Sequence, residues 1–286
     1  MASSPNWPPI PAELGAATVV ARLAPNAWRL RRTDSLPGSR PGGDVVLKTG
    51  PGVADEAAGL RALAEAGRRA GGPSGGPSGG PSGGPSVPPV IVEAGDVLVT
   101  GWVEPGGRTP VAEEELGRAL AALHRAPAAG WGGGSSWIGD CRVDPSPAPD
   151  AAGFYGRRLR ELAGRCGMDP VVAQLAERLP ELIPPGPPAL LHGDLWWGNV
   201  LWGTGDRPWL IDPSVHGGHP EEDLAMLALF GPVPDRRIRA YSEVRDLESG
   251  WAERLDLWQL YPLLVHTVLF GGGYRASAEA AARRYL

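Results

Sequence analysis

Apolar and polar positions alternate in short runs over the first hundred residues, which is the pattern of β-strands. Three such runs, ThrValValAlaArgLeu, AlaTrpArgLeuArg and AspValValLeuLys, lie between residues 17 and 48. The Pro, Gly, Asn and Asp residues between them are turn formers, so the segment is expected to form an antiparallel meander. Two more strand-like runs, ProProValIleVal and AspValLeuValThrGlyTrpVal, follow at 88–92 and 96–103.

Helical periodicity replaces this alternation at residue 55 and again beyond residue 104, where apolar residues recur every three or four positions. The expected helices span 55–70, 111–125, 150–166, 169–183, 220–230, 235–247, 251–270 and 275–285. Between two of them, residues 188–213 alternate short apolar runs with Gly, Asp and Asn, as loops and small hairpins do. GlyGlyProSer, repeated four times at 71–86, cannot bury a core and is expected to be a flexible, solvated insertion.

These patterns predict an α+β fold with two lobes. Residues 1–104 would form a small β-rich lobe that binds nucleotide, and residues 105–286 a larger, mainly helical lobe that holds the catalytic and substrate groups. The boundary falls at GluProGlyGly, residues 104–107. A ligand cleft is expected between the lobes.

The composition adds bounds on partners and compartment. The chain has 286 residues, of which 42% are hydrophobic and 21% charged, and its net charge is -5. An acidic protein has no general attraction to nucleic acid or anionic lipid, so neither is an expected partner. Cys141 and Cys166 are the only cysteines, and the sequence has neither a signal-peptide pattern nor a run of about 18 apolar residues. We therefore expect a soluble, cytoplasmic protein.

One residue stands out in the charge pattern, because Lys48 is the only lysine among 27 basic residues. A planar guanidinium cannot replace a compact ammonium that must fit between phosphate oxygens. Lys48 ends a predicted strand, and Glu56 lies on the helix that follows. A single lysine could also have survived by chance, so this observation alone decides nothing.

Three polar residues carry the candidate chemistry. LeuLeuHisGlyAspLeuTrpTrpGlyAsnValLeuTrp at 190–202 contains Asp194 and Asn199, and ProTrpLeuIleAspPro at 208–213 contains Asp212. This spacing matches a phosphoryl-transfer site in which one Asp accepts the proton of the attacking hydroxyl while an Asn and a later Asp hold Mg²⁺. Asn and Asp oxygens suit that hard cation. ATP and Mg²⁺ are the expected cofactors, with Lys48 on the nucleotide phosphates and Glu56 holding Lys48.

The segment 190–230 also resembles the fructosamine (ketosamine) kinase family, a branch of the aminoglycoside-phosphotransferase-like kinases with a protein-kinase-like fold. The likeness rests on HisGlyAspLeuTrpTrpGlyAsnValLeu and on IleAspProSerValHisGlyGlyHisProGluGluAsp. It continues through 254–275 and, more weakly, through LeuHis at 123–124 and TrpIleGly at 137–139. The resemblance implies ATP-dependent phosphorylation of a sugar hydroxyl on a ketosamine, either a small molecule or linked to a protein, as a deglycation step.

Residue roles follow from the same resemblance. It implies that Asp194 is the proton acceptor, that Asn199 and Asp212 are the metal ligands, and that Lys48 and Glu56 position the nucleotide. Further positions are implied as follows: a hinge facing adenine at Thr100, Gly101 and Trp102, contact with the acceptor sugar at His219, and structural support at His192 and Asp223. Trp196 is also expected to contact the acceptor, because sugar faces stack well on indole rings.

Two departures from the family pattern leave alternatives open. The family has a small residue after the first Trp, so the bulky Trp197 predicts an altered acceptor pocket. ProAsnAlaTrpArg at 25–29 replaces a Gly-containing turn over the phosphates. A related kinase acting on an aminoglycoside or a choline-like compound, and a nucleotide-binding protein without catalysis, are the alternatives.

Overall fold

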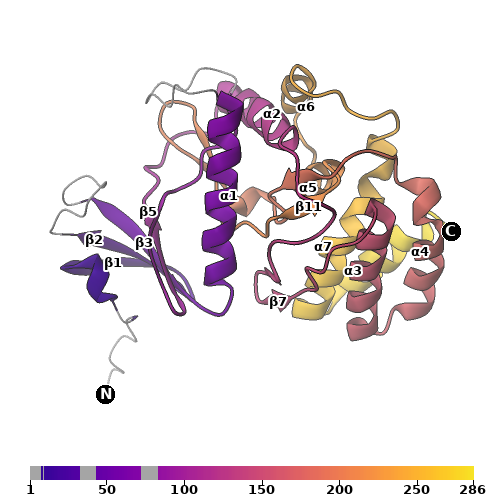
Figure 1. Cartoon of the computed structure of the whole chain (residues 1–286), viewed down its shortest axis with the longest axis horizontal. Coiled ribbons are helices and arrows are strands. Elements are labelled where there is room, and N and C mark those ends of the chain that lie inside the picture. The colour runs from indigo at the N-terminus through magenta and orange to yellow at the C-terminus, as the bar shows by residue number, and fades with distance from the viewer. Residues whose placement is uncertain (1–7, 9, 33–42, 72–82) are drawn as a thin grey trace.

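The N-terminal lobe is a five-stranded antiparallel sheet with one long helix beside it (Figure 1). The computed structural model describes Pro8 and residues 10–32, 43–71 and 83–286, and the strand order across the sheet is β1-β2-β3-β5-β4. The predicted meander and both later strands are confirmed. The elements are a 3-10 turn Ala12–Leu14, β1 Ala17–Ala24, β2 Ala27–Arg32, β3 Asp44–Thr49, α1 Val53–Gly71, β4 Val90–Ala94 and β5 Val97–Gly101.

Helix α1 forms because its apolar residues share one stripe and its charges suit its ends. Ala57, Leu60 and Leu63 are buried, and Leu60 packs with Leu98 of β5. Its first turn carries acidic residues, Glu56 among them, and its last turn is basic, which complements the helix dipole. Glu56 in this first turn lies beside the end of β3, where it pairs with Lys48.

The C-terminal lobe is mainly helical, and all eight predicted helices, α1 included, are confirmed with small differences at their ends. The largest difference is at 235–247, which ends as a helix at Ser242. No described helix is both long and apolar enough to cross a membrane. The elements are α2 Pro110–His124, β6 Trp137–Ile138, β7 Cys141–Arg142, α3 Ala151–Cys166, α4 Asp169–Leu182, β8 Ala189–Leu191, η2 Trp197–Asn199, β9 Val200–Trp202, β10 Pro208–Leu210, β11 His216–Gly218, α5 Glu221–Ala228, α6 Asp235–Ser242, η3 Ala252–Arg254, α7 Leu255–Phe270 and α8 Gly273–Arg283.

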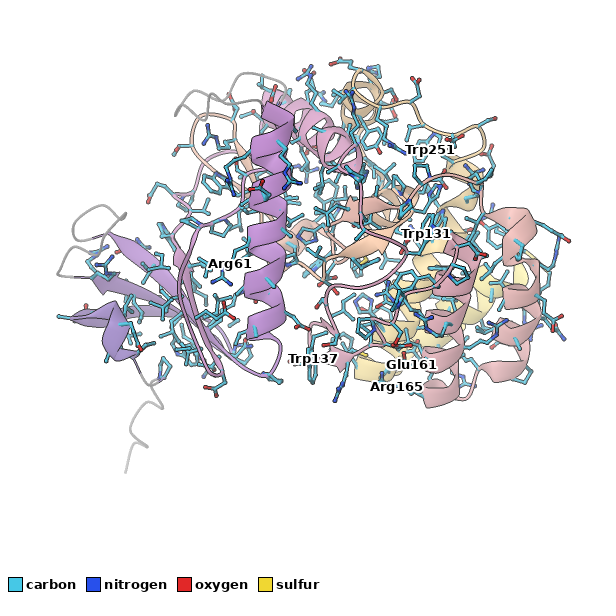
Figure 2. All side chains as sticks on the ribbon, viewed as in Figure 1. Arg61, Trp131, Trp137, Glu161, Arg165 and Trp251 are labelled. Carbon is cyan, nitrogen blue, oxygen red and sulfur yellow. The ribbon has the colours of Figure 1, made fainter. Side chains whose placement is uncertain are left out.

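Helix α1 also joins the two lobes. Leu63 and Ala66 share a buried cluster with α2 and with Leu195 and Leu210 of the C-terminal lobe. At the other end of α1, the Asp55 carboxylate accepts hydrogen bonds from the backbone N–H and the hydroxyl of Ser136, at 2.7 and 2.8 Å. Trp137, the next residue, lies just below this end of the helix (Figure 2). The loops between β8 and β11 therefore lie on a core shared by both lobes.

The GlyGlyProSer repeat lies mostly outside the described residues, which resume at Gly83. Its last residue, Ser86, forms a parallel bridge with Trp209 and accepts a hydrogen bond from Leu210 N–H at 2.8 Å. The predicted flexibility of the insertion stays a prediction. Its C-terminal end contacts the hairpin of β9 and β10.

Candidate active site

The candidate site lies where β3 and α1 meet the loops of the C-terminal lobe. Lys48 Nζ is 2.8 Å from Glu56 Oε1 and also forms an ion pair with Asp212 Oδ1, although Lys48 and Asp212 are 164 positions apart in the sequence. The side chains of Lys48 and Glu56 are each 16% exposed, and that of Asp212 is 41% exposed. The unique lysine thus links the N-terminal lobe to the loop that carries Asp212.

Charge balance at this junction favours a permanently charged lysine. Burial disfavours the ammonium, but the nearby Asp212 and Glu56 carboxylates outweigh it and raise the pKa of Lys48. Burial together with the Asp212 charge raises the pKa of Glu56, against the effect of the ammonium. One cation therefore faces two carboxylates, so the three groups together carry a net negative charge.

Asp194 and Asn199 lie on the loop between β8 and β9. The Asn199 Nδ2 group donates to the Asp194 carbonyl oxygen at 2.8 Å and to Asp194 Oδ2 at 3.2 Å. The backbone N–H of Ile211 donates to the Asn199 carbonyl at 3.1 Å, which brings the end of β10, and hence Asp212, back beside the loop. A short hairpin thus folds three residues that are separated in sequence onto one site.

Asp194 has the protonation behaviour of a base near neutral pH. Burial and, next, the Asp212 carboxylate raise its pKa to about 7, while the hydrogen bond from Asn199 opposes the shift. A carboxylate with a raised pKa holds a transferred proton more readily than an ordinary Asp does. The arrangement is suited to taking a proton from a hydroxyl group.

His192 ties the Asp194 loop to the Asp212 loop. Its Nε2 lies 3.0 Å from the Ile211 carbonyl and its Nδ1 lies 3.3 Å from Asp194 N–H, so the neutral ring donates through Nε2 and accepts through Nδ1. Burial lowers the pKa of His192, which favours that neutral form. Asp212 itself has a φ of +55°, a left-handed backbone that costs a non-glycine residue about 1 kcal/mol or more.

Asp223 supports the loop from its underside. Its carboxylate accepts the backbone N–H groups of His192 and Gly193 at 2.8 and 2.9 Å, and it lies 3.1 Å from His124 Nε2. The His124 Nδ1 in turn lies 2.8 Å from the Tyr241 hydroxyl. Burial favours the neutral acid, but hydrogen bonds and charge from the imidazoles lower the pKa of Asp223. His124 and Tyr241 were not predicted, and the only sequence signal for either was the LeuHis pair at 123–124.

The residues present fit a magnesium ion bound together with phosphates. Asn199 uses its amide nitrogen on Asp194, which leaves its oxygen for a cation, and Asp212 supplies an anionic oxygen. Within the described ranges, no group of three or more His, Cys, Asp or Glu residues could hold a metal. Mg²⁺ commonly takes only one or two protein ligands and completes its shell with water and substrate phosphates.

The predicted hinge is at the end of β5, but its backbone donors are already engaged. Gly101 N–H donates to the Pro89 carbonyl at 2.9 Å, and Trp102 N–H donates to the Asp44 carbonyl at 3.3 Å. Thr100 is 5% exposed. Contact between these residues and adenine therefore stays a prediction, which rests on their position between the lobes.

The two predicted acceptor residues differ in exposure. Trp196, two residues after Asp194, is 38% exposed and meets the ring of Phe230 edge-on, with centroids 5.7 Å apart. His219 is 5% exposed and stacks on Trp258 at 5.0 Å, with its Nδ1 accepting the Glu221 N–H at 3.3 Å. Trp196 is available to a ligand, whereas His219 packs in the interior, and its contact with a sugar stays a prediction.

The side chain of Trp197 has different neighbours from that of Trp196. Its ring lies under the guanidinium groups of Arg108 and Arg237, at 4.5 and 4.1 Å from the ring centroid, and packs against the cluster that α1 and α2 share. The expectation that this residue alters the acceptor pocket has no support in these contacts. The indole is accommodated beside Arg108, just before α2, and Arg237 of α6.

Comparisons with known proteins show which family this chain resembles. The family model for fructosamine kinase matches residues 86–286. A probable ketoamine kinase of Thermus thermophilus is 35% identical over 246 residues, which are 81% of this chain and 84% of that protein. The chloroplastic protein-ribulosamine 3-kinase of Arabidopsis thaliana is 32% identical over 208 residues, 67% of this chain and 62% of that protein.

Solved structures give the same result for the fold. A protein of Thermobifida fusca assigned as a fructosamine-3-kinase superposes with a TM-score of 0.76 at 36% identity, covering 94% of this chain and 92% of that one. A choline kinase of Streptococcus pneumoniae, 13% identical with a TM-score of 0.58 over 94% of each chain, shares the fold alone. The two-lobed kinase-like fold is thereby confirmed, and the chain belongs to the fructosamine kinase family.

Proposed function

We propose that this protein transfers the γ-phosphate of ATP to a sugar hydroxyl of a ketosamine such as a fructosamine or ribulosamine, as a deglycation kinase. The observation that carries the proposal is the ion pair between Lys48 and Asp212, formed beside Asp194 and Asn199. Family membership supports the acceptor class, because relatives are named as ketoamine and ribulosamine kinases. We keep the division into a nucleotide lobe, 1–104, and a catalytic lobe, 105–286, as part of the proposal.

Each residue has a role that its surroundings support. Lys48, held by Glu56, would bind nucleotide phosphates, and Asn199 and Asp212 would hold Mg²⁺. When bound, that ion neutralises negative charge on the phosphate oxygens. Asp194 would accept the hydroxyl proton, a transfer helped by its pKa of about 7.

The exposed ring of Trp196 offers an apolar face for the sugar beside the proton acceptor.

We propose a cytoplasmic location from the two cysteines of the sequence, because secreted proteins of oxidising compartments more often depend on disulfides. Small-molecule and protein-linked ketosamines are both admitted by this proposal.

The test is a phosphorylation assay with ATP, Mg²⁺ and fructosyl- or ribulosyl-lysine, with the phosphorylated product measured by mass spectrometry. Asp194→Ala should lower kcat by about 10²- to 10⁴-fold, the usual contribution of a positioned base. Asp140→Ala, an exposed residue in the turn between β6 and β7, is the matched control and should leave kcat unchanged.

An acceptor panel separates the alternatives. Turnover of choline or an aminoglycoside but of no ketosamine would replace the acceptor class. ATP binding without turnover of any acceptor would contradict the kinase proposal as a whole.

A further inference from the structure

We propose that Arg108, Glu113, Trp197 and Arg237, here called the Trp197 cluster, position Asn199 for metal binding. Trp197 would then act on the metal side of the site and not in the acceptor pocket. The inference rests on the proposed function, since Asn199 is a metal ligand only in that proposal. The four residues are positioning residues, because none of them would touch the substrate.

The contacts of the cluster are dense and charged. Arg108 and Arg237 both lie over the Trp197 ring, and both pair with Glu113, one on each carboxylate oxygen. Glu113 is 5% exposed and Arg237 is 1% exposed. A guanidinium over an indole is attracted to the ring face, and more strongly where water is excluded. The ring is therefore held by two cations that a single buried anion fixes.

Burial makes this arrangement costly to change. Burial lowers the pKa of Arg237 to about 10, even though Glu113 acts in the opposite direction. A buried cation that loses its anion or its ring contact is left without compensation, which destabilises the fold. Among the described residues, Nε and Nη1 of Arg237 have no hydrogen-bond partner, so the buried guanidinium depends on its ion pair with Glu113 and on the face of the Trp197 ring.

Trp197 and Asn199 belong to the same 3-10 turn, η2, with only Gly198 between them. Asn199 N–H donates to the Trp196 carbonyl at 2.9 Å, and Val200 N–H donates to the Trp197 carbonyl. Because the two residues share one three-residue turn, holding the indole restricts the backbone that carries Asn199. That backbone places the Asn199 amide within hydrogen-bonding distance of Asp194.

The segment between the lobes reaches the same turn through Arg108. Gly106 N–H donates to the Trp202 carbonyl at 2.7 Å, and the Thr109 hydroxyl donates to Asp206 at 2.5 Å. A Cβ on Gly106 would lie 2.2 Å from the Gly203 carbonyl oxygen, so only glycine allows this approach. The segment lies directly on the hairpin of β9 and β10, which joins Asn199 to Asp212.

The first experiment measures metal binding without turnover. Mn²⁺ is titrated into the full chain with a non-hydrolysable ATP analogue, and free Mn²⁺ is followed by electron paramagnetic resonance. Trp197→Ser should weaken Mn²⁺ binding about tenfold, as loss of a residue that orients a ligand does. Trp197→Phe, which keeps an aromatic face for the cations, should restore most of the affinity. The KM for the ketosamine should change less than twofold in both.

A milder pair of variants guards against misfolding. Arg108 is 49% exposed, so Arg108→Gln should fold and should weaken Mn²⁺ binding about twofold to threefold through its cation–π contact. Arg207→Gln is the matched control, because Arg207 lies over Trp209 of the same hairpin, at 6.0 Å, and should leave Mn²⁺ binding unchanged.

Two results would overturn the inference. One is Mn²⁺ binding that matches wild type in Trp197→Ser while the ketosamine KM rises, which would return Trp197 to the acceptor pocket. The other is an equal effect of the Arg108 and Arg207 variants. Failure of the proposed function is distinguishable, because the titration contains no acceptor. A wild type that phosphorylates no ketosamine would contradict the proposed function, whereas the inference is decided by the Mn²⁺ affinities of the variants relative to wild type.

Discussion

Asp194, on the loop between β8 and β9, and Asp223, on α5 beneath that loop, have surroundings that shift their pKa values in opposite directions. On the underside, Asp223 accepts two backbone N–H groups and contacts His124, and its pKa is lowered. On the open face, the side-chain oxygen of Asp194 receives one side-chain hydrogen bond, from Asn199, and faces a second carboxylate, Asp212. Its pKa rises to about 7.

The difference separates support from chemistry. A buried carboxylate whose hydrogen bonds are complete stabilises its charged form and holds the backbone around it. When a carboxylate has few hydrogen-bond donors and a like charge nearby, its ionisation destabilises the fold. Its oxygens are then available to a proton or a cation. Such strongly perturbed groups cluster at functional sites. Asp223 therefore serves the fold, and Asp194 is the residue on which the reaction is proposed to depend.

Replacing Asp223 should give the largest effect on stability. Asp223→Asn keeps the size of the side chain but replaces one of its two acceptor oxygens by an NH₂ group, so one of the two backbone donors loses its acceptor and the free energy of unfolding should fall by about 3 kcal/mol. Because the folded-state pKa is lowered, this carboxylate stabilises above its unfolded pKa, near 3.8, and the contribution is lost as the pH falls through the folded pKa. Urea unfolding at pH 7, and at a series of pH values below 3.8, measures both.

The matched control for Asp223→Asn is Asp140→Asn, an exposed residue in the same lobe. It should change the free energy of unfolding by less than about 0.5 kcal/mol. Equal stability of the Asp223 and Asp140 variants would mean that the underside contacts contribute nothing, and the comparison would fail.

Asp194→Asn should have the opposite sign. The folded-state pKa of about 7 exceeds the unfolded value near 3.8, so ionisation of Asp194 destabilises the fold as the pH rises from about 4 to above 7. At pH 8 the variant should therefore be more stable than wild type by about 1 to 3 kcal/mol, with no gain at pH 3.5. Thermal or urea unfolding at the two pH values, without Mg²⁺ or nucleotide, measures the difference. A loss of stability at pH 8 would show that the contacts of the Asp194 carboxylate stabilise its charged form, as those of Asp223 do.

The sequence was sufficient for the elements and for the residues of the open face. Helical and alternating periodicity located α1 to α8 and the five strands of the sheet, because amphipathic patterning is local. The lone Lys48 and the spacing of Asp194, Asn199 and Asp212 named residues that the fold brings together from both lobes. Chemistry of this kind restricts residue type strongly and is therefore visible in one chain.

The contacts beneath the loop could not be read from the sequence. His124 and Tyr241 are 117 positions apart and meet only because α2 and α6 pack together. The contact of His219 with the sugar stays a prediction, and its stacking on Trp258 is indicated by no local pattern. Trp197 was expected to alter the acceptor pocket, and no local pattern indicated that its ring lies under arginines from distant segments. Side-chain direction within a loop depends on tertiary packing that periodicity does not encode.

Lys48→Arg gives the smallest expected effect and asks whether the open face is built around a compact ammonium. Arginine keeps the charge for Glu56 and Asp212, but its planar, five-donor head is wider than the ammonium and fits phosphate oxygens differently. The KM for ATP should rise about tenfold, equivalent to about 1.4 kcal/mol. The reverse exchange, Arg61→Lys, is the control, since Arg61 pairs with Glu93 of the sheet and lies on the side of α1 that faces the sheet (Figure 2). A Lys48→Arg enzyme whose KM for ATP stays within twofold of wild type would show that the charge alone matters, and the single lysine of the chain would carry no information about the phosphates.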